Sequence, residues 1–326
     1  MAEILVSYDP GEHRKLYSRI LPKDADLKFL PDIPESDRKR VLRSAEVLVV
    51  WNPARELAPE EFDLLENVRL IQLVTAGADH LRFREMPKQA LIASNPGAYA
   101  APMAEHILAM TLALAKRLCA NNAKLRKGEF DQKTKNRRLR GAAFGVLGFG
   151  GIGRAAAGLM RSLDMKILAV NTSGRTTETV DFVGTLDDLD YLLKNCDVLL
   201  VSIPLTLRTK GLIGSRELAL MKPDAIIINV ARGSIIDEKA LYDHLVRNAE
   251  FSAGVDTWWV EPQTSGEFRI DCPFFDLPNF LGSPHNSAIV PGVMTEAVGM
   301  AAENVAAFLR EKNIRGVIRK EDYLEG

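Results

Sequence analysis

The amino-acid sequence predicts an α/β protein built from doubly wound parallel sheets. Short apolar runs alternate with helical patterns along almost the whole chain, and this alternation is typical of strand–helix–strand units. The chain has 326 residues, and because a domain usually has about 150 residues, two domains are expected. A glycine-rich segment at residues 148–153 lies between an apolar run and an alanine-rich helical pattern.

Nine apolar runs are predicted to be strands. They cover residues 3–7, 27–30, 46–51, 69–74, 142–147, 166–171, 197–203, 225–230 and 251–255. Residues 98–119 carry Ala, Met, Ile and Leu on nearly every helical face, so this helix is expected to be enclosed between domains or subunits. A last amphipathic helix is predicted over residues 293–312, just after Pro291.

Composition and charge exclude several classes of protein. Apolar residues make up 47% and charged residues 26% of the chain, which suits a globular protein and excludes general disorder. The net charge of −1 provides no overall field that would attract nucleic acid or an anionic membrane. The basic stretch at residues 124–140 is predicted to be a solvated connection, because no aromatic platform accompanies its charges.

The three cysteines, Cys119, Cys196 and Cys272, have neither metal-ligand nor disulfide spacing. No metal site is therefore expected, and a reducing compartment is the simplest environment. The first residues do not resemble a signal sequence, and no run of 18 apolar residues occurs. We therefore expect a cytoplasmic protein without a membrane span.

The segment at residues 148–153 has the pattern GxGxxG in the strand–turn–helix context that makes this motif specific for dinucleotides. Gly148 would allow the tight turn, Gly150 would let the backbone approach a pyrophosphate, and Gly153 would let helix and strand pack closely. Gly151 and Ile152 would begin the helix, whose free N–H groups bind the anion. A nicotinamide dinucleotide is the expected cofactor.

Cofactor selectivity is expected to depend on the end of the next strand. An acid about 20 residues beyond the glycines usually binds the ribose hydroxyls of NAD, but the sequence has Asn171 there, followed by Ser173 and Arg175. An amide, a hydroxyl and a guanidinium would accept a 2′-phosphate, so NADP(H) is predicted to be preferred. The alternative is a polar loop that accepts NAD(H) as well.

Three residues are candidates for the chemistry. Arg232 follows the strand predicted at 225–230, Glu261 follows the strand predicted at 251–255, and His285 lies further along the chain. Ligands of open parallel sheets bind at the carboxyl ends of the strands. Each residue alone has an ordinary explanation, such as a surface ion pair for arginine or a loop acid for glutamate.

The order of these motifs resembles that of the D-isomer-specific 2-hydroxyacid dehydrogenase family over nearly the whole chain. The resemblance is carried by the glycine loop and by several separated motifs. They are residues 203–206 with Thr209 and Gly211, residues 221–223, residues 229–237, residues 256–262, and Pro284 with His285.

This resemblance implies that His285 is the general acid/base, Glu261 its carboxylate partner and Arg232 the clamp for the substrate carboxylate. The chemistry agrees, since a guanidinium can hold a carboxylate with two charge-assisted hydrogen bonds. An imidazolium can protonate the alkoxide formed when a hydride reaches a 2-keto carbon.

The resemblance also implies further binding residues. Asp256 would accept a hydrogen bond from the nicotinamide carboxamide. Backbone N–H groups of Ala76 and Gly77 would meet the substrate carboxylate, and Tyr99 would border the cleft. Additional cofactor contacts are expected at Pro204, Thr209 and Ala231.

The family architecture implies a Rossmann cofactor domain, residues 98–287, inserted in a flavodoxin-like substrate domain formed by residues 1–97 and 288–326. The helix at 98–119 would mediate a two-fold homodimer. The partner molecule would be a small 2-keto acid, with glyoxylate and hydroxypyruvate as leading candidates, because there is no room for the regulatory extension of many phosphoglycerate dehydrogenases. Trp258, Trp259 and Phe130 depart from common family residues, so the pocket size is not carried over.

Other functions are weighed against this one. Another 2-hydroxyacid dehydrogenase, acting on D-lactate or phosphoglycerate, is a close alternative. Formate dehydrogenases have Gln where this chain has Glu261. Nucleotide-sensing co-repressors share the fold and the Arg–Glu–His set. No catalytic role is expected for the other histidines, which are His13, His80, His106 and His244.

Overall fold

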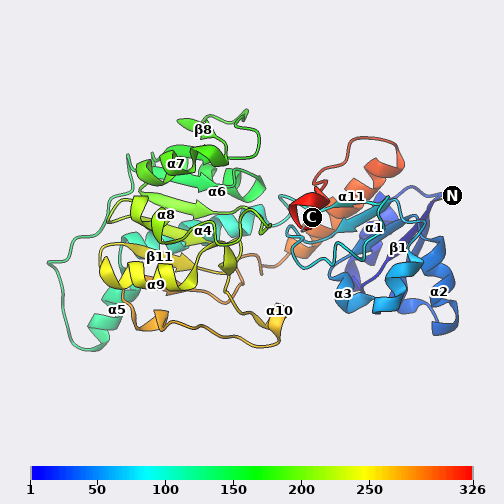
Figure 1. Ribbon diagram of the computed structural model, residues 1–326, viewed down its shortest axis with the longest axis horizontal. Helices are drawn as coiled ribbons and strands as arrows, with labels where there is room; N and C mark the ends of the chain where they lie inside the picture. The colour runs from blue at the N-terminus through cyan, green and yellow to red at the C-terminus, as the bar shows by residue number, and fades with distance from the viewer. Residues whose placement is uncertain (1, 325–326) are drawn as a thin grey trace. The chain divides into compact units, whose positions relative to one another are not determined.

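The computed structural model describes residues 2–324, which fold as two compact units (Figure 1). One unit comprises Met1–Tyr99 and Val290–Gly326, and the other comprises Ala100–Ile289. The boundaries expected from the sequence, 97/98 and 287/288, compare with 99/100 and 289/290 in the structure. Each unit contains one parallel sheet, and the predicted fold class is confirmed.

The sheet of the first unit has the strand order β2-β1-β3-β4-β5, which is the flavodoxin-like order 2-1-3-4-5. Its strands are β1 (Glu3–Val6), β2 (Asp26–Phe29), β3 (Val47–Val50), β4 (Leu70–Leu73) and β5 (Leu91–Ala93). All neighbouring strands are parallel, with Ile4 paired to Leu27 on one side and to Val47 on the other.

Helices cover both faces of this sheet. They are α1 (Arg14–Ile20), α2 (Glu35–Ser44), α3 (Pro53–Glu56) and α11 (Val293–Leu309). Successive strand residues point to opposite faces, and Leu5 and Val6 accordingly belong to different clusters. Leu5 packs with Leu42 of α2, whereas Val6 packs with Tyr17 of α1 and Val305 of α11. The returning helix α11 thus completes the core of the first unit.

The sheet of the second unit has the order β12-β11-β10-β9-β6-β7-β8, the doubly wound Rossmann order with one further strand. Its strands are β6 (Ala143–Leu147), β7 (Lys166–Val170), β8 (Phe182–Gly184), β9 (Val198–Val201), β10 (Ile226–Asn229), β11 (Ser252–Val255) and β12 (Phe280–Gly282). Every neighbouring pair is parallel. The carboxyl ends of all seven strands therefore lie along one edge of the sheet.

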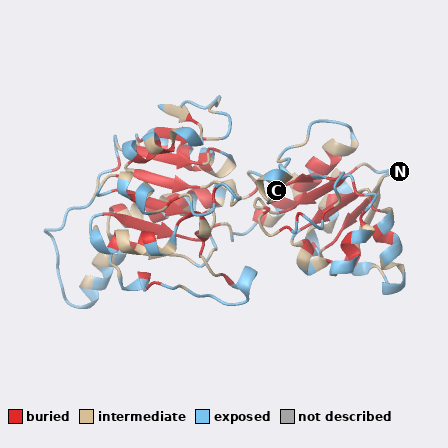
Figure 2. Cartoon of the chain, in the orientation of Figure 1, coloured by how far each residue is buried: buried red, intermediate tan, exposed pale blue. Residues whose placement is uncertain are grey.

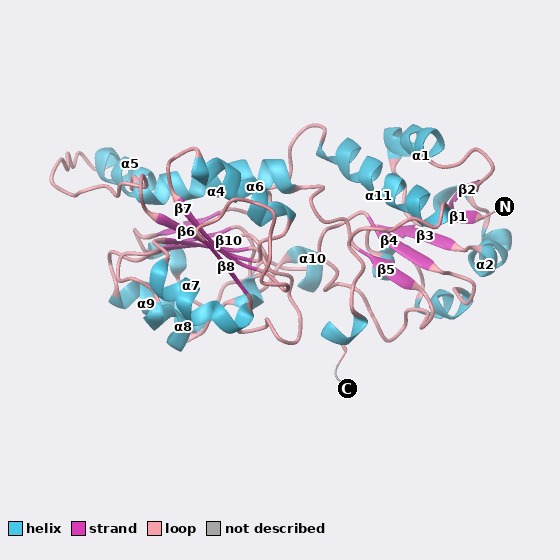
Figure 3. Cartoon of the chain, turned by 90° about the horizontal axis from the view of Figure 1, so that it is seen from above, coloured by secondary structure: helices cyan, strands magenta, loops and turns pink. Residues whose placement is uncertain are grey.

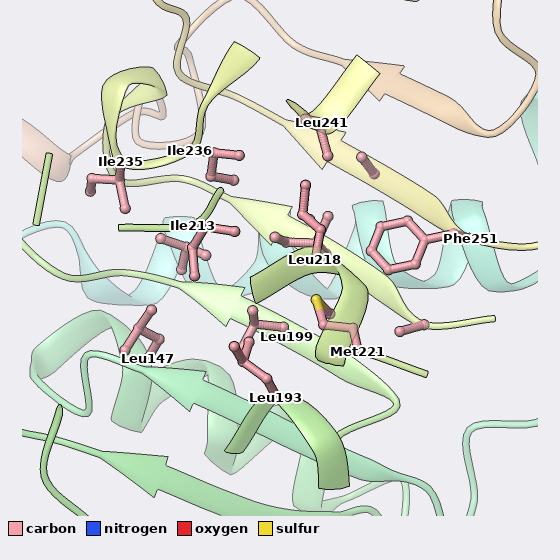
Figure 4. Packing of buried hydrophobic residues seen from close by; sticks show 14 of the residues in the cluster. Leu147, Leu193, Leu199, Ile213, Leu218, Met221, Ile235, Ile236, Leu241 and Phe251 are labelled. Carbon is pink, nitrogen blue, oxygen red and sulfur yellow. The ribbon is translucent and has the colours of Figure 1, made fainter. Parts of the chain in front are cut away.

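The helices of the second unit form two layers. They are α4 (Ala100–Ala115), α5 (Leu118–Arg126), α6 (Gly151–Arg161), α7 (Leu189–Asn195), α8 (Ser215–Leu220), α9 (Glu238–Arg247) and α10 (Pro262–Ser265). Figure 3 shows α4 and α6 on one face of the sheet and α7, α8 and α9 on the other. On the second face, Leu147 and Leu199 of the strands pack with Leu193, Leu218 and Leu241 of these three helices (Figure 4).

Buried residues are concentrated in the two sheets (Figure 2). All four residues of β3 and all four of β10 are buried, as expected for strands of parallel sheets covered on both faces. No helix among the described residues combines the length and apolar character needed to cross a membrane.

Three strands were not predicted from the sequence. They are β5, β8 and β12, each of three residues and each at an edge of its sheet. A three-residue edge strand shows only one or two buried positions, which is too short a pattern for an apolar run to be recognised.

The single helix predicted at 98–119 is wrong in extent. It ends at Ala115, and Arg117 has a left-handed backbone conformation with φ of 51°, which separates α4 from α5. Within its unit, Glu105 of this helix is exposed although Ile107 and Met110 are buried, and the expected enclosure between domains or subunits stays a prediction. The last helix ends at Leu309 rather than at residue 312.

Candidate active site

The three predicted catalytic residues follow three adjacent strands. Arg232 comes three residues after β10, Glu261 follows β11, and His285 comes three residues after β12. These strands are neighbours in the order β12-β11-β10. Their carboxyl ends share one edge of the sheet, where open α/β folds bind ligands.

Glu261 and His285 are in direct contact. Nδ1 of His285 lies 2.7 Å from Oε2 of Glu261, and Oε1 of Glu261 accepts a hydrogen bond of 2.6 Å from the backbone N–H of Trp258. The Glu261 side chain is 9% exposed and that of His285 is 33% exposed. The carboxylate is thus held at both oxygens, and Nε2 is the ring nitrogen left to exchange a proton with a ligand.

Arg232 is presented by a turn that Asn229 organises. The buried Asn229 amide accepts from the N–H of Ala231 at 3.0 Å and donates to the Arg232 carbonyl at 2.9 Å. A Cβ on the next residue, Gly233, would lie 2.3 Å from the carbonyl carbon of Trp258. Only glycine therefore allows the Arg232 turn to pack directly on the segment whose N–H binds Glu261.

Asp256 is fully buried and accepts hydrogen bonds from the loop that carries His285. Its Oδ1 accepts from Oγ of Ser283 at 2.6 Å and from the N–H of Asn286 at 3.2 Å, and its Oδ2 accepts from the N–H of Ser287 at 3.2 Å. Burial alone would raise the pKa of Asp256, but hydrogen bonds from Ser283 and Ser287 outweigh it, and the pKa is lowered. The implied contact with the nicotinamide stays a prediction.

Two residues beside Asp256 were missed by the sequence analysis. Nε2 of His106, on α4, lies 2.9 Å from Oγ of Ser283. The two residues are 177 positions apart, so no local pattern connects them. The sequence analysis assigned His106 no catalytic role and did not anticipate this tertiary contact.

The glycine loop has the shape that a dinucleotide requires. Gly148 has φ of +106°, which favours glycine, and a Cβ there would lie 2.7 Å from the backbone of Ser202. A Cβ on Gly153 would lie 2.5 Å from the Gly148 carbonyl oxygen, whereas a Cβ on Gly150 would meet no atom within 4 Å. Gly148 and Gly153 are therefore required by packing, and Gly150 leaves open space at the start of α6.

Gly151 and Ile152 form the first turn of α6, which begins at Gly151. The N–H groups of a first helical turn have no partner within the helix and favour an anion. Together with the open space at Gly150, this turn fits the pyrophosphate of a nicotinamide dinucleotide.

Asn171 organises the loop that was predicted to select the cofactor. Its Oδ1 accepts from the N–H groups of Ser173 and Gly174, at 3.0 and 2.8 Å, and its Nδ2 donates to the carbonyl of Arg175 at 2.9 Å. The amide is thus engaged within the turn. Ser173 and Arg175 are exposed, as is Thr172, so this turn presents several polar residues to solvent.

Thr209 has a structural role in the loop after β9. Its buried hydroxyl accepts from the N–H of Thr206 at 2.8 Å and donates to the carbonyl of Pro204 at 2.7 Å. Pro204 is exposed and Ala231 is half-buried. Pro204 and Ala231 follow the adjacent strands β9 and β10, and their contacts to a cofactor stay predictions.

The predicted substrate-binding residues of the first unit lie after β4. Ala76 and Gly77 are half-buried, and the Thr75 hydroxyl donates to the Gly77 carbonyl at 2.9 Å. The Tyr99 hydroxyl donates to the Val74 carbonyl at 3.1 Å, and burial raises the pKa of Tyr99. Tyr99 therefore supports the Val74–Gly77 turn as a neutral phenol.

An aromatic cavity of about 300 Å³ lies beside the Glu261–His285 pair. Both residues line it, together with Trp258, Phe268 and Phe275. The Trp258 indole donates to the Ser283 carbonyl at 2.8 Å and is buried. Trp258 therefore ties the Glu261 loop to the His285 loop.

Trp259 and Phe130, the other two aromatic residues that differ from common family residues, have different surroundings from Trp258. The Trp259 indole donates to the Ile236 carbonyl at 2.7 Å and stacks on Phe274 with ring centroids 5.4 Å apart. Phe130 is 77% exposed. Trp259 thus has a packing role, and Phe130 has no enclosing pocket within its unit.

Comparison with known proteins gives a consistent result. A sequence model described as D-isomer specific 2-hydroxyacid dehydrogenase, NAD binding domain, matches residues 108–287. Hydroxypyruvate reductase of Thermotoga maritima is 30% identical over 280 residues, covering 85% of each chain. D-3-phosphoglycerate dehydrogenase of Methanocaldococcus jannaschii is 29% identical over 98% of this chain, but this chain spans 59% of that protein.

Among solved structures, a Pyrobaculum aerophilum protein provisionally described as a formate dehydrogenase is 25% identical and has a TM-score of 0.82. The alignment covers 99% of this chain and 100% of that chain. The similarity extends over both α/β units.

Proposed function

Because the chain belongs to the D-isomer-specific 2-hydroxyacid dehydrogenase family, we propose that it transfers a hydride between NADP(H) and a small 2-keto or D-2-hydroxy acid. Glyoxylate and hydroxypyruvate are the leading substrates. The observation that carries this proposal is the 2.7 Å contact between Glu261 and His285 at the sheet edge where Arg232 also lies.

Arg232 holds the substrate in the proposed reaction. A guanidinium remains charged at any working pH and presents a planar fork of donors, which matches the planar carboxylate of a 2-keto acid. The Asn229 amide and the close packing of Gly233 fix the turn from which this side chain extends. The carboxylate is thereby oriented before any bond changes.

His285 moves the proton. When bound, the nicotinamide supplies the hydride in reduction and accepts it in oxidation. His285 donates a proton from Nε2 to the oxygen of the former carbonyl, while Glu261 at Nδ1 stabilises the positive charge of the ring before that transfer. In the opposite direction, neutral Nε2 accepts the hydroxyl proton.

The preference for NADP(H) rests on the loop after β7. This loop has no carboxylate from residue 171 to residue 175, and its residues Ser173 and Arg175 are exposed. A 2′-phosphate would gain charge-assisted hydrogen bonds there, whereas an acid at this place would repel it. NAD(H) lacks that phosphate and is proposed to be the weaker cofactor.

We also propose that the protein is cytoplasmic and forms a homodimer. Its three cysteines are all free thiols, which suits a reducing compartment. The dimer contact is proposed on α4 and the following α5, where Leu118 and Leu125 are more than half exposed. Apolar side chains of this size favour burial against a second copy.

Three alternatives differ in what they require. D-lactate and phosphoglycerate dehydrogenases would use the same three residues and differ only in the substrate's side chain. A formate dehydrogenase would be expected to have Gln in place of Glu261. A nucleotide-sensing co-repressor would bind the cofactor with negligible turnover.

A substrate panel run with both reduced cofactors tests the proposal. Glyoxylate, hydroxypyruvate, pyruvate and phosphohydroxypyruvate should each be offered with NADPH and with NADH while absorbance of the cofactor is followed. We expect the highest kcat/KM for glyoxylate or hydroxypyruvate with NADPH. Equal kcat/KM for the two cofactors would remove the claim of selectivity, and cofactor binding without turnover of any acid would favour a sensor.

A further inference from the structure

A histidine outside the proposed catalytic set is hydrogen-bonded to the loop of His285. His106 extends from α4, and its Nε2 lies 2.9 Å from the Ser283 hydroxyl oxygen and 3.7 Å from Oδ1 of Asp256. The Ser283 hydroxyl lies 2.6 Å from the same Oδ1. These three side chains come from α4, from the end of β11 and from the end of β12.

Counting donors assigns the protons in this group. The pKa of Asp256 is lowered, because its hydrogen bonds outweigh the effect of burial, so the carboxylate is ionised and can only accept. The single proton of the Ser283 hydroxyl is therefore donated to Oδ1 of Asp256. Ser283 must then accept from His106, which requires a proton on Nε2 of His106.

The same carboxylate binds both sides of His285. Besides the Ser283 hydroxyl, it accepts from the N–H groups of Asn286 and Ser287, each at 3.2 Å. His285 lies in the sequence between Ser283 and Asn286, and it has a positive φ of 51°. A bulky residue in the left-handed region is strained and persists only where its surroundings hold it.

We propose that His106 and Ser283 are positioning residues that act through Asp256 to hold the backbone of His285 in its left-handed conformation. This inference rests on the proposed function, in which His285 must present Nε2 to the substrate. The carboxylate at Asp256 anchors the loop on both sides of His285, and His106 directs the Ser283 proton toward that carboxylate. The proposed role of either residue requires no contact with the substrate.

The proton assignment can be tested without turnover. Long-range ¹H–¹⁵N correlation spectra of the ¹⁵N-histidine-labelled protein distinguish a protonated from a bare Nε2, and the chain has five histidines to assign. We expect Nε2 of His106 to be protonated at neutral pH. A bare Nε2 with the proton on Nδ1 would overturn the inference.

Kinetics separate positioning from packing. His106→Leu removes the donor, and we expect kcat for reduction to fall about tenfold, with KM for the keto acid changed by less than about twofold. His106→Gln places an amide N–H near the former Nε2 and should restore most of kcat. Thr111→Val is the matched control, since it removes a hydroxyl of the same helix that donates to the Ile107 carbonyl.

Two outcomes of the single variants contradict the proposal. One is an unchanged kcat in His106→Leu, and the other is a His106→Gln variant that is as slow as His106→Leu. The double variant His106→Leu/Ser283→Ala should be no slower than the slower single variant, because both changes remove one connected unit. Additive losses would show independent roles and would also contradict it.

Failure of the proposed function is recognised separately. If the unmodified protein turns over no 2-keto acid, the proposed function fails, and the positioning network is judged on the ring signals of His285 alone. We expect those signals to shift in His106→Leu and in Ser283→Ala but not in Thr111→Val. Unshifted His285 signals in the first two variants would overturn the network whether or not the protein is active.

Discussion

Glu261 and His285, 24 residues apart in the chain, are joined by a 2.7 Å contact between Oε2 and Nδ1. The other oxygen of Glu261 accepts from the N–H of Trp258, whose indole in turn donates to the Ser283 carbonyl. The two loops are thereby connected twice. The imidazole is held in one orientation at a place where its own backbone is strained, as is common at functional sites.

Replacing Glu261 by Gln should slow reduction without preventing folding. An amide oxygen can still accept from Trp258, but a neutral amide no longer stabilises the protonated imidazole. We expect kcat for reduction to fall about 10²-fold, at the lower end of the usual contribution of acid–base catalysis. Glu267→Gln, on the exposed part of the same loop, is the control, and equal activities of the two variants would argue against the pair.

Replacing Arg232 by Lys should weaken the hold on the substrate. Lysine keeps the charge but loses the planar fork, so about one charge-assisted hydrogen bond is lost, and kcat/KM is expected to fall about 10- to 100-fold. Most of the change should appear in KM for the keto acid. The surface variant Arg216→Lys, whose guanidinium pairs with Asp190, should change neither constant. A normal KM in Arg232→Lys would mean that the carboxylate is bound elsewhere.

Gly150→Ala tests whether the glycine loop binds the cofactor or is an ordinary turn. A Cβ at Gly150 meets no atom within 4 Å, and the backbone has φ of −90°, so the variant should fold normally. Because that Cβ would project into the space expected for the pyrophosphate, NADPH affinity should fall at least about tenfold. The control Gly158→Ala, also open and on the same helix α6, should keep full affinity and gain up to about 1 kcal/mol of stability. Equal NADPH dissociation constants for the two variants, measured by titration, would contradict the assignment.

Asp256→Asn should reduce stability in a pH-dependent way. The lowered pKa means that ionised Asp256 stabilises the folded state above the ordinary carboxyl pKa of about 3.9, and that this contribution is lost as pH falls through the lower folded-state pKa. At neutral pH the loss in the free energy of unfolding should be about 1–3 kcal/mol. Denaturant unfolding of both proteins at neutral and at acidic pH measures it. If the two proteins differed in free energy of unfolding by the same amount at acidic pH, the negative charge of Asp256 would not contribute to stability.

The sequence was sufficient for most of the fold because its strands are buried on both faces. Runs such as β3 and β10 are apolar throughout, and the glycine loop has steric requirements at Gly148 and Gly153 that few other residues meet. The short edge strands were missed because three residues contain too little of a pattern. The break at Arg117 was missed because neither glycine nor proline marks it.

The site was predictable to the extent that its residues follow strands. Arg232 and Glu261 follow predicted strands, whereas the pairing of Glu261 with His285 was implied by the family resemblance, because the strand before His285 was not predicted. His106 could not be found in this way, because its contact with Ser283 depends on how α4 packs against the sheet. The role of Asn171 within its own turn also depends on a backbone geometry that the sequence does not state.

The most direct test of the account is the rate of NADPH oxidation by glyoxylate and hydroxypyruvate in the unmodified protein and in His285→Gln, with the NADPH dissociation constant measured for both. We expect His285→Gln to bind NADPH as the unmodified protein does and to lose about 10²- to 10⁴-fold in kcat, since the proton donor at Nε2 is gone. A His285→Gln variant that retained the full rate would contradict the assignment of the acid and, with it, the proposed mechanism.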